Sequence, residues 1–274
     1  MKIEDLIIEG KKHLSSSEAK MLLASITGYD SLELLLHLDE EMSIDDIDKY
    51  KKMIKAVKNN YPIQYIIGNV SFLGNDIKVN DNVLIPRFET EDMVDRSIKY
   101  IKSYFGDKKD LKIVDLGTGS GCIAISLKKA FPNAQVDAVD ISDKAIELAT
   151  ENASINGANV NFYIDDMINF LNDEYDVIIS NPPYIEEDSS EVEEIVLNNE
   201  PSLALFAANN GLYFYEEILK KVSHTISAKA MIIFEIGYMQ GASIEKLCNQ
   251  YLKDANFILE KDMSDKDRFV FIYI

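Results

Sequence analysis

From residue 111 onward, short apolar runs typical of buried strands alternate with segments that have the apolar spacing of helices. The strand-like runs are LKIVDLG (111–117), AQVDAVDIS (134–142), NFYID (161–165), YDVIIS (175–180) and KAMIIFEIG (229–237). The helix-like segments are CIAISLKKAF (122–131), DKAIELATENASING (143–157), which we expect to end at Gly157, and ASIEKLCNQYL (242–252). This alternation predicts an α/β fold with a parallel, doubly wound sheet.

The two ends of the chain have other patterns. FILEKDMSDKDRFVFIYI (257–274) predicts two strands around a polar turn, an antiparallel hairpin at the edge of the sheet. Residues 1 to about 60 predict helices, one of which opens with Ser15 and Glu18 in capping-box spacing. Between them, GNVSFLGNDIKVNDNVLI alternates around Gly74-Asn75 and predicts a β-hairpin. We therefore expect a helical N-terminal domain over 1–62, a hairpin linker over 63–85 and an α/β domain over 86–274.

Charge and composition disfavour several classes of protein. The net charge of −19 is unlike the basic face with which a protein grips a phosphate backbone, so we expect no direct nucleic-acid substrate. There is no run of the roughly 20 apolar residues that span a bilayer, and the charged N-terminus is unlike a signal peptide. Two cysteines suit a reducing cytoplasm, and the three histidines share no ligand spacing with them, so we expect no metal site.

A glycine-rich turn follows the first strand of the α/β region. In VDLGTGSGCIA (114–124), Gly117, Gly119 and Gly121 allow a tight turn and close approach of a ligand, and a helix N-terminus follows. The third glycine comes one residue too early for a dinucleotide fingerprint, and the Gly-Lys-Ser/Thr of a phosphate loop is missing. The turn therefore favours a ligand site without a phosphate cradle over a purely structural role.

Acidic residues follow the next two strands. Asp140 ends the second strand, 23 residues after Gly117, where its carboxylate can accept both hydroxyls of a ribose. Asp165, Asp166 and Met167 follow the third strand and reach the same crevice. Either acid can accept from an adenine amino group or cap the next helix, and Met167 can cover the ring. A nucleoside without phosphates fits this pattern, and S-adenosylmethionine is the obvious candidate. The pattern resembles the class I methyltransferases, with their Rossmann-like fold.

Asn181-Pro182-Pro183-Tyr184 follows the fourth strand, where prolines stop the strand and stiffen the chain. The side-chain oxygen of Asn181 and the carbonyl of Pro182 can hold the two N–H groups of a planar amide or amine. Such acceptors stabilise the positive charge that develops on nitrogen during methyl transfer. Tyr184 can stack on the flat substrate group. We interpret the motif as an acceptor site for a planar nitrogen.

The stretches YPIQYIIGNVSFLGNDIKVNDNVLIPRFETE (61–91), NEPSLALFAANNGLYFYEEIL (199–219) and FEIGYMQG (234–241) resemble the PrmC/HemK family, the N5-glutamine methyltransferases of peptide chain release factors. The resemblance covers essentially the whole chain. It implies that the substrate is the glutamine of the Gly-Gly-Gln loop of a release factor, with Asn181 to Tyr184 as the amide site. It also implies cofactor contacts from the loop and the acids, namely Gly117, Thr118, Gly119, Ser120, Gly121, Asp140, Asp166, Met167 and Asn181.

Some roles stay open at this point. Phe88 stands where the family usually has proline, and it can contact the methionine end of the cofactor or pack internally. Arg87, Thr90 and Glu91 can position the cofactor's amino-acid end, or Arg87 and Glu91 can simply pair. Cys122 suits a small buried residue at a helix start.

Three other functions compete with release factor methylation. A glutamine methyltransferase of a ribosomal protein would share the Asn-Pro-Pro-Tyr motif but fits IPRFETE less well. A DNA or RNA amino-methyltransferase conflicts with the charge and lacks a target-recognition domain. The presence of both Asn181 and Tyr184 argues against a non-enzymatic adenosyl-binding scaffold, which would have no need of two positioned amide acceptors.

Overall fold

The computed structural model describes residues 1–186, 193–224 and 227–274. Backbone contacts divide the chain into two compact units. The first takes residues 1–69 and 193–199, and the second takes the described residues between 70 and 192 and between 200 and 274. None of the described helices is both long and apolar enough to cross a membrane.

The first unit is helical, as predicted. Its helices are α1 (Ile3–Gly10), α2 (Ser16–Thr27), α3 (Ser31–Leu36), α4 (Ile44–Lys58), α5 (Ile63–Ile67) and α10 (Glu194–Asn199). The capping box of α2 is confirmed, because Glu18 N donates to Ser15 Oγ and Ser15 N to the Glu18 carboxylate. Helix α10 was not expected here; it belongs to this unit, and Asn199 Nδ2 donates to the carbonyl of Asn60 at 2.9 Å.

The second unit contains the predicted sheet. Its strands are β3 (Lys112–Leu116), β4 (Gln135–Asp140), β5 (Asn161–Ile164), β6 (Val177–Ser180), β7 (Met231–Glu235), β8 (Asn256–Lys261) and β9 (Asp267–Tyr273). They lie in the order β5-β4-β3-β6-β7-β9-β8. The pairs from β5 to β7 are parallel, and β9 is antiparallel to both β7 and β8. The doubly wound sheet with an antiparallel edge hairpin is therefore confirmed.

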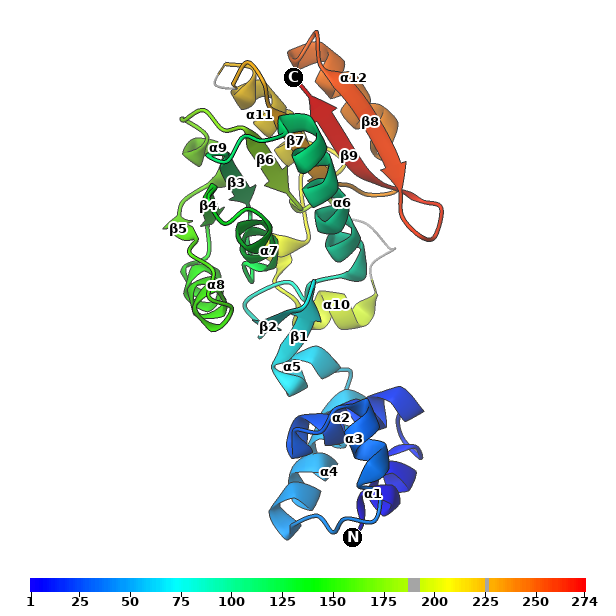
Figure 1. Cartoon of the computed structure of the whole chain (residues 1–274). Helices are drawn as coiled ribbons and strands as arrows, with labels where there is room; N and C mark the ends of the chain where they lie inside the picture. The colour runs from blue at the N-terminus through cyan, green and yellow to red at the C-terminus, as the bar shows by residue number, and fades with distance from the viewer. Residues whose placement is uncertain (187–192, 225–226) are drawn as a thin grey trace. The chain divides into compact units, whose positions relative to one another are not determined.

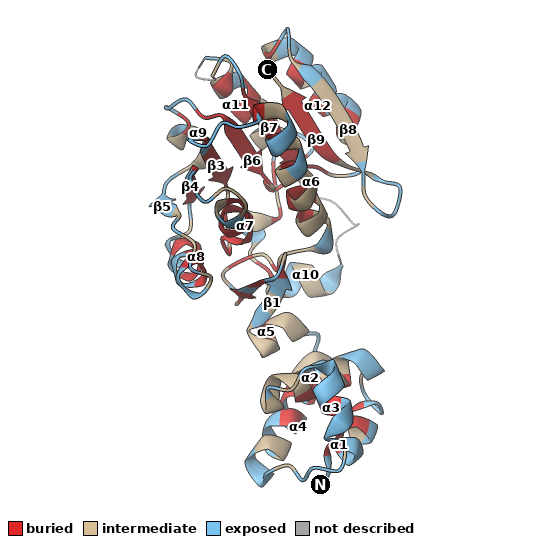
Figure 2. Ribbon diagram, in the orientation of Figure 1, coloured by how far each residue is buried: buried red, intermediate tan, exposed pale blue. Residues whose placement is uncertain are grey.

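Helices cover both faces of this sheet (Figure 1). They are α6 (Phe88–Phe105), α7 (Cys122–Ala130), α8 (Asp143–Ile155), α9 (Met167–Phe170), α11 (Tyr213–Val222) and α12 (Gly241–Tyr251), with a short 3-10 helix, η1 (Ser202–Ala204). Helix α7 contacts α6 and α8 on one face, and α11 contacts α9 and α12 on the other. Figure 2 shows the central strands buried between these layers. A strand covered on both faces can be buried along its whole length, as are all four residues of β6, VIIS.

The predicted hairpin forms from β1 (Asn69–Phe72) and β2 (Asn75–Lys78), but its turn is Leu73-Gly74 and not Gly74-Asn75. Leu73 and Gly74 both have positive φ, 47° and 73°, as a tight hairpin turn requires. Asn75 is already in β2 and is buried, where its Nδ2 donates to Ser126 Oγ of α7 at 3.0 Å.

Strand register brings three loops together at the carboxyl edge of the sheet. Leu116 at the end of β3 pairs with Val139 of β4 on one side and with Ser180 of β6 on the other. The chain leaves β3 toward β4 and β5, and later returns to form β6 and β7 on the other side. This reversal of strand order is where open α/β sheets bind ligands.

Candidate active site

The glycine loop between β3 and α7 folds back on the end of β4. The backbone N–H groups of Gly117 and Thr118 both donate to the Val139 carbonyl, at 2.9 and 3.0 Å. Gly117, Gly119 and Gly121 have φ of +75°, +54° and +81°, a region that side-chain-bearing residues rarely adopt. A Cβ on Gly117 would lie 3.1 Å from Met167 Cε. Glycine therefore keeps a narrow space open between the loop and Met167.

Asp115, near the end of β3, holds this loop through hydrogen bonds. Its Oδ2 accepts from the Thr118 hydroxyl at 2.6 Å and from the Ala124 N–H at 3.2 Å, while its Oδ1 has no partner. Burial raises the pKa of Asp115 to about 7, and the hydrogen bond from Thr118 lowers it. The Thr118 hydroxyl thus holds the loop in shape.

Asp140 closes the other side of the loop. Its Oδ2 accepts from Gly119 N at 2.9 Å and its Oδ1 from Ser142 N at 3.0 Å. Burial raises the pKa of Asp140, and these backbone hydrogen bonds oppose the shift. A carboxylate has about four acceptor positions, so Asp140 keeps capacity to accept further hydrogen bonds from a ligand.

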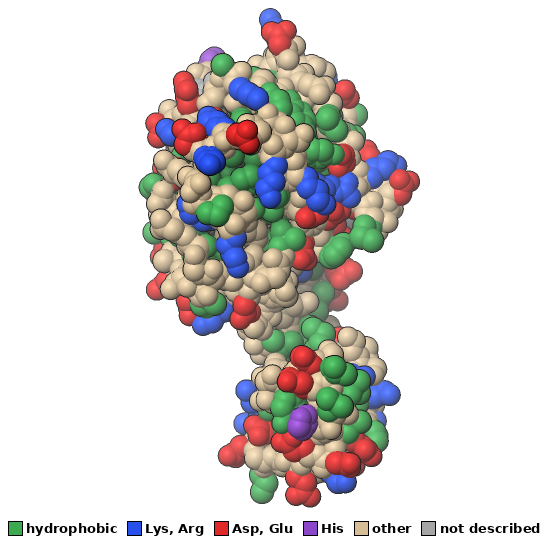
Figure 3. Space-filling view, viewed as in Figure 1, with side chains coloured by type: hydrophobic (Ala, Val, Ile, Leu, Met, Phe, Trp, Pro, Cys, Tyr) green, Lys and Arg blue, Asp and Glu red, His purple; other side chains and the backbone are tan. Residues whose placement is uncertain are grey.

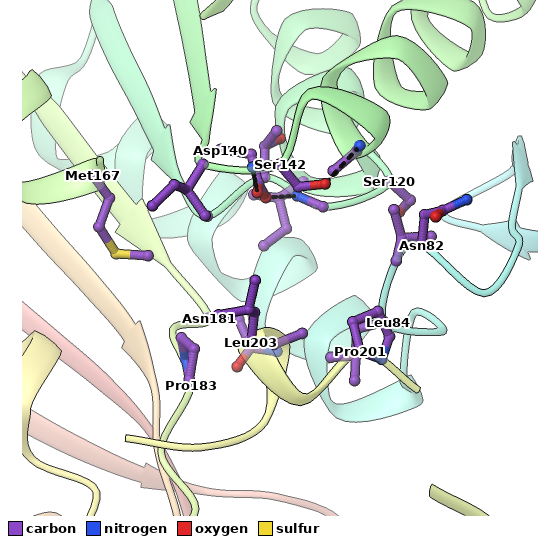
Figure 4. A pocket seen from close by; sticks show the side chains of 18 of the residues that line it. Asn82, Leu84, Ser120, Asp140, Ser142, Met167, Asn181, Pro183, Pro201 and Leu203 are labelled. Atoms are coloured by element: carbon purple, nitrogen blue, oxygen red, sulfur yellow. Dashed lines mark hydrogen bonds between the residues drawn. The ribbon is translucent and has the colours of Figure 1, made fainter. Parts of the chain in front are cut away.

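A cavity of about 230 Å³ lies over these loops. In Figure 4, Met167 lies at one end and Asn82 at the other, with Asp140 and Ser142 on one side and Asn181 and Pro183 on the opposite side. Of the residues predicted from the sequence, those that line it are Gly117, Thr118, Gly119, Ser120, Asp140, Asp166, Met167, Asn181 and Pro183. Loop residues and part of the Asn-Pro-Pro-Tyr motif therefore share one cavity.

Three predicted residues do not line the cavity. Gly121 faces α8, where an added Cβ would lie 3.0 Å from Ala149 Cβ. Pro182 is buried, and Tyr184 is partly buried and packs against the core beneath β6 and β7. Burial raises the pKa of Tyr184, so its hydroxyl stays protonated.

The acids after β5 have separate positions. Asp166 lines the cavity, but its Oδ1 also caps α9 by accepting from Ile168 N and Asn169 N, at 2.9 and 3.0 Å. Asp165 is exposed and is not among the lining residues. Of the two, only Asp166 can meet a ligand while it caps the helix.

Asn181 leads into a buried polar chain. Its Nδ2 lies 3.1 Å from Thr90 Oγ1, which in turn lies 2.6 Å from Glu235 Oε2. Burial raises the pKa of Glu235 to about 7, while the hydrogen bond from Thr90 and the nearby charge of Arg268 lower it.

The structure shows which partners some of the residues with open roles have. Arg87 Nη2 pairs with Glu200 Oε1 at 2.5 Å, and Glu91 Oε1 accepts from Leu73 N at 2.7 Å, so Arg87 and Glu91 do not pair with each other. Phe88 is 61% exposed and does not line the cavity, so the internal packing role is wrong. Cys122 is buried at the start of α7, as expected, and burial raises the pKa of its thiol to about 12.

Sequence reasoning missed more than half of the lining. The unpredicted residues are Asn82, Val83, Leu84, Pro86, Ile123, Ile141, Ser142, Ala145, Pro201, Leu203, Ala204 and Phe214, with Thr90 and Cys122, whose roles had been left open. Ile141 carried a sequence signal, because it is an apolar residue directly after the strand-ending Asp140. The structure leaves it 61% exposed, where it is available to a ligand. Within the described residues, no three His, Cys, Asp or Glu side chains are grouped as metal ligands.

Two family models match the chain. The methyltransferase small domain matches residues 88–204, and the PrmC N-terminal domain matches residues 7–68. Full-length relatives are also similar. The release factor glutamine methyltransferase of Bacillus subtilis is 39% identical, over 92% of this chain and 89% of that protein. The enzyme of the same name from Lactococcus lactis is 36% identical, over 97% of this chain and 98% of that protein.

Solved structures agree on the fold. A ribosomal protein L11 methylase from Lactobacillus delbrueckii has a TM-score of 0.50 at 20% identity, covering 72% of this chain and 83% of that chain. The catalytic domain of human Mettl16, solved with an RNA hairpin, has a TM-score of 0.54 at 13% identity, covering 84% and 82%. Another methyltransferase-fold structure, solved with SAH, has a TM-score of 0.54 at 12% identity, covering 75% and 55%. At these identities the likeness shows the methyltransferase fold.

Proposed function

This chain belongs to the family of release factor glutamine methyltransferases, and we propose that it methylates the side-chain amide nitrogen of the glutamine in the Gly-Gly-Gln loop of peptide chain release factors. The observation that carries the proposal is that Asn181 and Pro183 line the same cavity as the glycine loop and Asp140. The residues that we assign to the cofactor and to the substrate amide thus share one cavity, which supports transfer between two bound molecules.

The residues at the loop fit S-adenosylmethionine, the methyl donor of this family. Asp140 presents two carboxylate oxygens with acceptor capacity, which suits the two hydroxyls of a ribose. Gly117 leaves the space beneath Met167 open, and Met167 with Ile141 offers apolar cover for a flat ring. When bound, S-adenosylmethionine supplies an electrophilic methyl group on its sulfonium. Asp166 is the acid that we assign to the adenine end.

Asn181 and the proline after it would hold the glutamine. The strand β6 ends at Ser180, so the Pro182 carbonyl lies beyond the last strand pairing. The Asn181 oxygen and this carbonyl are two acceptors for the two N–H groups of an amide. They stabilise the nitrogen more strongly as it becomes tetrahedral and positive, which lowers the barrier. Two prolines fix the acceptors in advance. Tyr184 packs against the core outside the cavity lining, so we do not assign it the stacking predicted from the sequence.

The partner that we propose is a protein, docked in part by the helical domain over 1–62 and the hairpin linker over 63–85. The net charge of −19 supports a protein over a nucleic-acid partner. Figure 3 shows acidic and basic side chains interspersed on the visible face of the second unit, without a single-sign field. We also propose a cytoplasmic location, where both buried cysteines, Cys122 and Cys248, remain free thiols.

The test is methyl transfer from labelled S-adenosylmethionine to purified release factor, wild type beside a release factor whose Gly-Gly-Gln glutamine is changed to alanine. We expect label on the wild-type factor alone. Asn181→Ala should lower kcat by at least about a hundredfold while cofactor binding is kept. The matched control is Asn169→Ala, an exposed amide on α9, which should leave turnover unchanged. Label on both factors, or none on either with cofactor bound, would contradict the proposal.

A further inference from the structure

Three side chains from distant parts of the sequence form one hydrogen-bonded chain, which runs from the partly buried Asn181 to two buried residues. Asn181 follows β6, Thr90 lies in the first turn of α6 and Glu235 ends β7. Asn181 Nδ2 is 3.1 Å from Thr90 Oγ1, and Thr90 Oγ1 is 2.6 Å from Glu235 Oε2. Thr90 and Glu235 are 3% and 2% exposed, so the bond between them is shielded from water.

The chemistry of the three groups sets the direction of every bond. When Glu235 is ionised its carboxylate only accepts, so Thr90 donates its single proton to Glu235. Its hydroxyl oxygen then has only lone pairs left for Asn181, and it must accept from the amide nitrogen. The nitrogen and oxygen of the Asn181 amide point to opposite sides, so the oxygen is turned away from Thr90.

The far end of the chain is itself fixed. The Tyr215 hydroxyl donates to the Glu235 carbonyl at 2.7 Å, and Arg268 Nη1 donates to the Ile236 carbonyl at 3.0 Å. The end of β7 is therefore held by two side chains from α11 and β9, and Glu235 presents its carboxylate to Thr90 from a rigid position.

We propose that Thr90 and Glu235 are positioning residues, which lock the Asn181 amide in the one orientation that offers its oxygen to the substrate amide. The inference rests on the proposed function, in which that substrate is an N–H donor. In the reversed orientation Asn181 would present its own NH2 to the substrate NH2, donor against donor. Nothing in Asn181 alone prevents this rotation, because the two ends of an amide have nearly the same shape.

The decisive variant is Thr90→Val, which removes the hydroxyl at almost constant volume. We expect kcat for release factor methylation to fall by about tenfold or more, which is the effect of one net hydrogen bond. KM should change by less than about threefold, and the dissociation constant for S-adenosylmethionine, measured by calorimetry, by less than about twofold. Thr90→Ser keeps the hydroxyl and should restore most of the rate.

Ser97→Ala is the matched control. Ser97 is a fully buried hydroxyl on the same helix, but it donates only to the Met93 carbonyl of its own helix, at 2.6 Å. Its loss should leave kcat unchanged. Glu235→Gln should lower kcat, because a glutamine can donate to Thr90 and so release the Thr90 proton toward Asn181.

A second readout does not depend on activity. The side-chain NH2 signals of Asn181, identified by their absence in Asn181→Ala, should shift in Thr90→Val and stay in place in Thr90→Ser and Ser97→Ala. Unshifted signals in Thr90→Val, or an equal loss of kcat in Ser97→Ala, would overturn the inference. A wild-type protein that fails to methylate release factor would overturn the proposed function instead, and the amide signals would still decide whether the chain orients Asn181.

Discussion

The Thr118 hydroxyl donates a 2.6 Å hydrogen bond to Oδ2 of Asp115, so the glycine loop is tied to the end of β3, the strand that precedes it. Asp115 is fully buried, and burial raises its pKa from an ordinary 3.8 to about 7. Since the folded-state pKa lies above the unfolded value, the folded protein binds this proton more tightly. The contribution of Asp115 to stability is therefore greatest at low pH and declines as pH rises toward 7.

Asp115→Asn should remove this pH dependence. Between pH 5.5 and 7.5, we expect the free energy of unfolding of the variant to rise relative to wild type by about 2 kcal/mol. Wild type loses about 1.36 kcal/mol for each pH unit between pH 5.5 and the folded-state pKa of about 7. Urea unfolding at several pH values measures it. Asp143→Asn, with an exposed carboxylate at the start of α8, is the control and should run parallel to wild type. Parallel curves for Asp115→Asn would mean that Asp115 is not the group that titrates.

Asp140→Asn should weaken cofactor binding. Asp140 joins Gly119 N and Ser142 N and lines the cavity, and a hydrogen bond to a charged group contributes about 1.5–3 kcal/mol. The dissociation constant for S-adenosylmethionine, measured by calorimetry, should therefore rise by roughly ten- to a hundredfold. Asp143→Asn again serves as the matched control. An unchanged constant in Asp140→Asn would remove the ribose role.

Gly117→Ala should both strain the backbone of the glycine loop and fill the space beside Met167. Its φ of +75° costs a side-chain-bearing residue about 1–2 kcal/mol, and the new Cβ would lie 3.1 Å from Met167 Cε. Gly157→Ala has the same backbone problem, with φ +62°, but no atom within 4 Å of the added Cβ. We expect similar losses of stability from both, and a weaker dissociation constant for S-adenosylmethionine from Gly117→Ala alone. Equal cofactor binding in the two variants would show that the space beneath Met167 is not used.

The parts of the fold and site that could be predicted are those written in local patterns. The spacing of apolar residues in strands and helices predicted the parallel sheet. The glycine loop and Asp140 follow strands whose register brings their ends together. Asn181 could be placed at the same edge for the same reason. Its role as a hydrogen-bond acceptor could be predicted because an amide followed by two prolines has few purely structural uses.

The parts of the fold and site that could not be predicted depend on contacts between residues that are far apart in sequence. Thr90 and Glu235 are 145 residues apart, and Arg87 and Glu200 are 113 apart, and neither pair has a periodic signal. The cavity wall from Asn82 to Pro86 comes from the loop after β2. Strand β2 contacts α8 through Asn152, whose Oδ1 accepts from Lys78 N at 2.8 Å, and this contact helps to position the loop. Such pairings are set by tertiary packing and by the burial of polar groups, which propensity does not encode.

The last prediction concerns Glu235, whose burial raises its pKa to about 7. Several titratable groups on the elements around β7 interact electrostatically with Glu235. They are Arg268, Glu89, Arg87, Tyr184, Tyr215 and Cys122. Arg268 and Arg87 favour the carboxylate, and Glu89 opposes it. A balance near neutral pH makes the protonation state of Glu235 sensitive to ordinary changes of buffer.

Turnover should therefore rise with pH through about 7. Below that value Glu235 is protonated and can donate to Thr90, which frees the Thr90 proton for the Asn181 oxygen and turns the amide the wrong way. We expect kcat to fall by up to about tenfold per pH unit below the midpoint and to reach a plateau above it. Glu235→Gln should be flat between pH 6 and 8, and Ser97→Ala should keep the wild-type profile. The measurement is kcat at saturating release factor and S-adenosylmethionine, and an acid limb that survives in Glu235→Gln would assign the titration to another group.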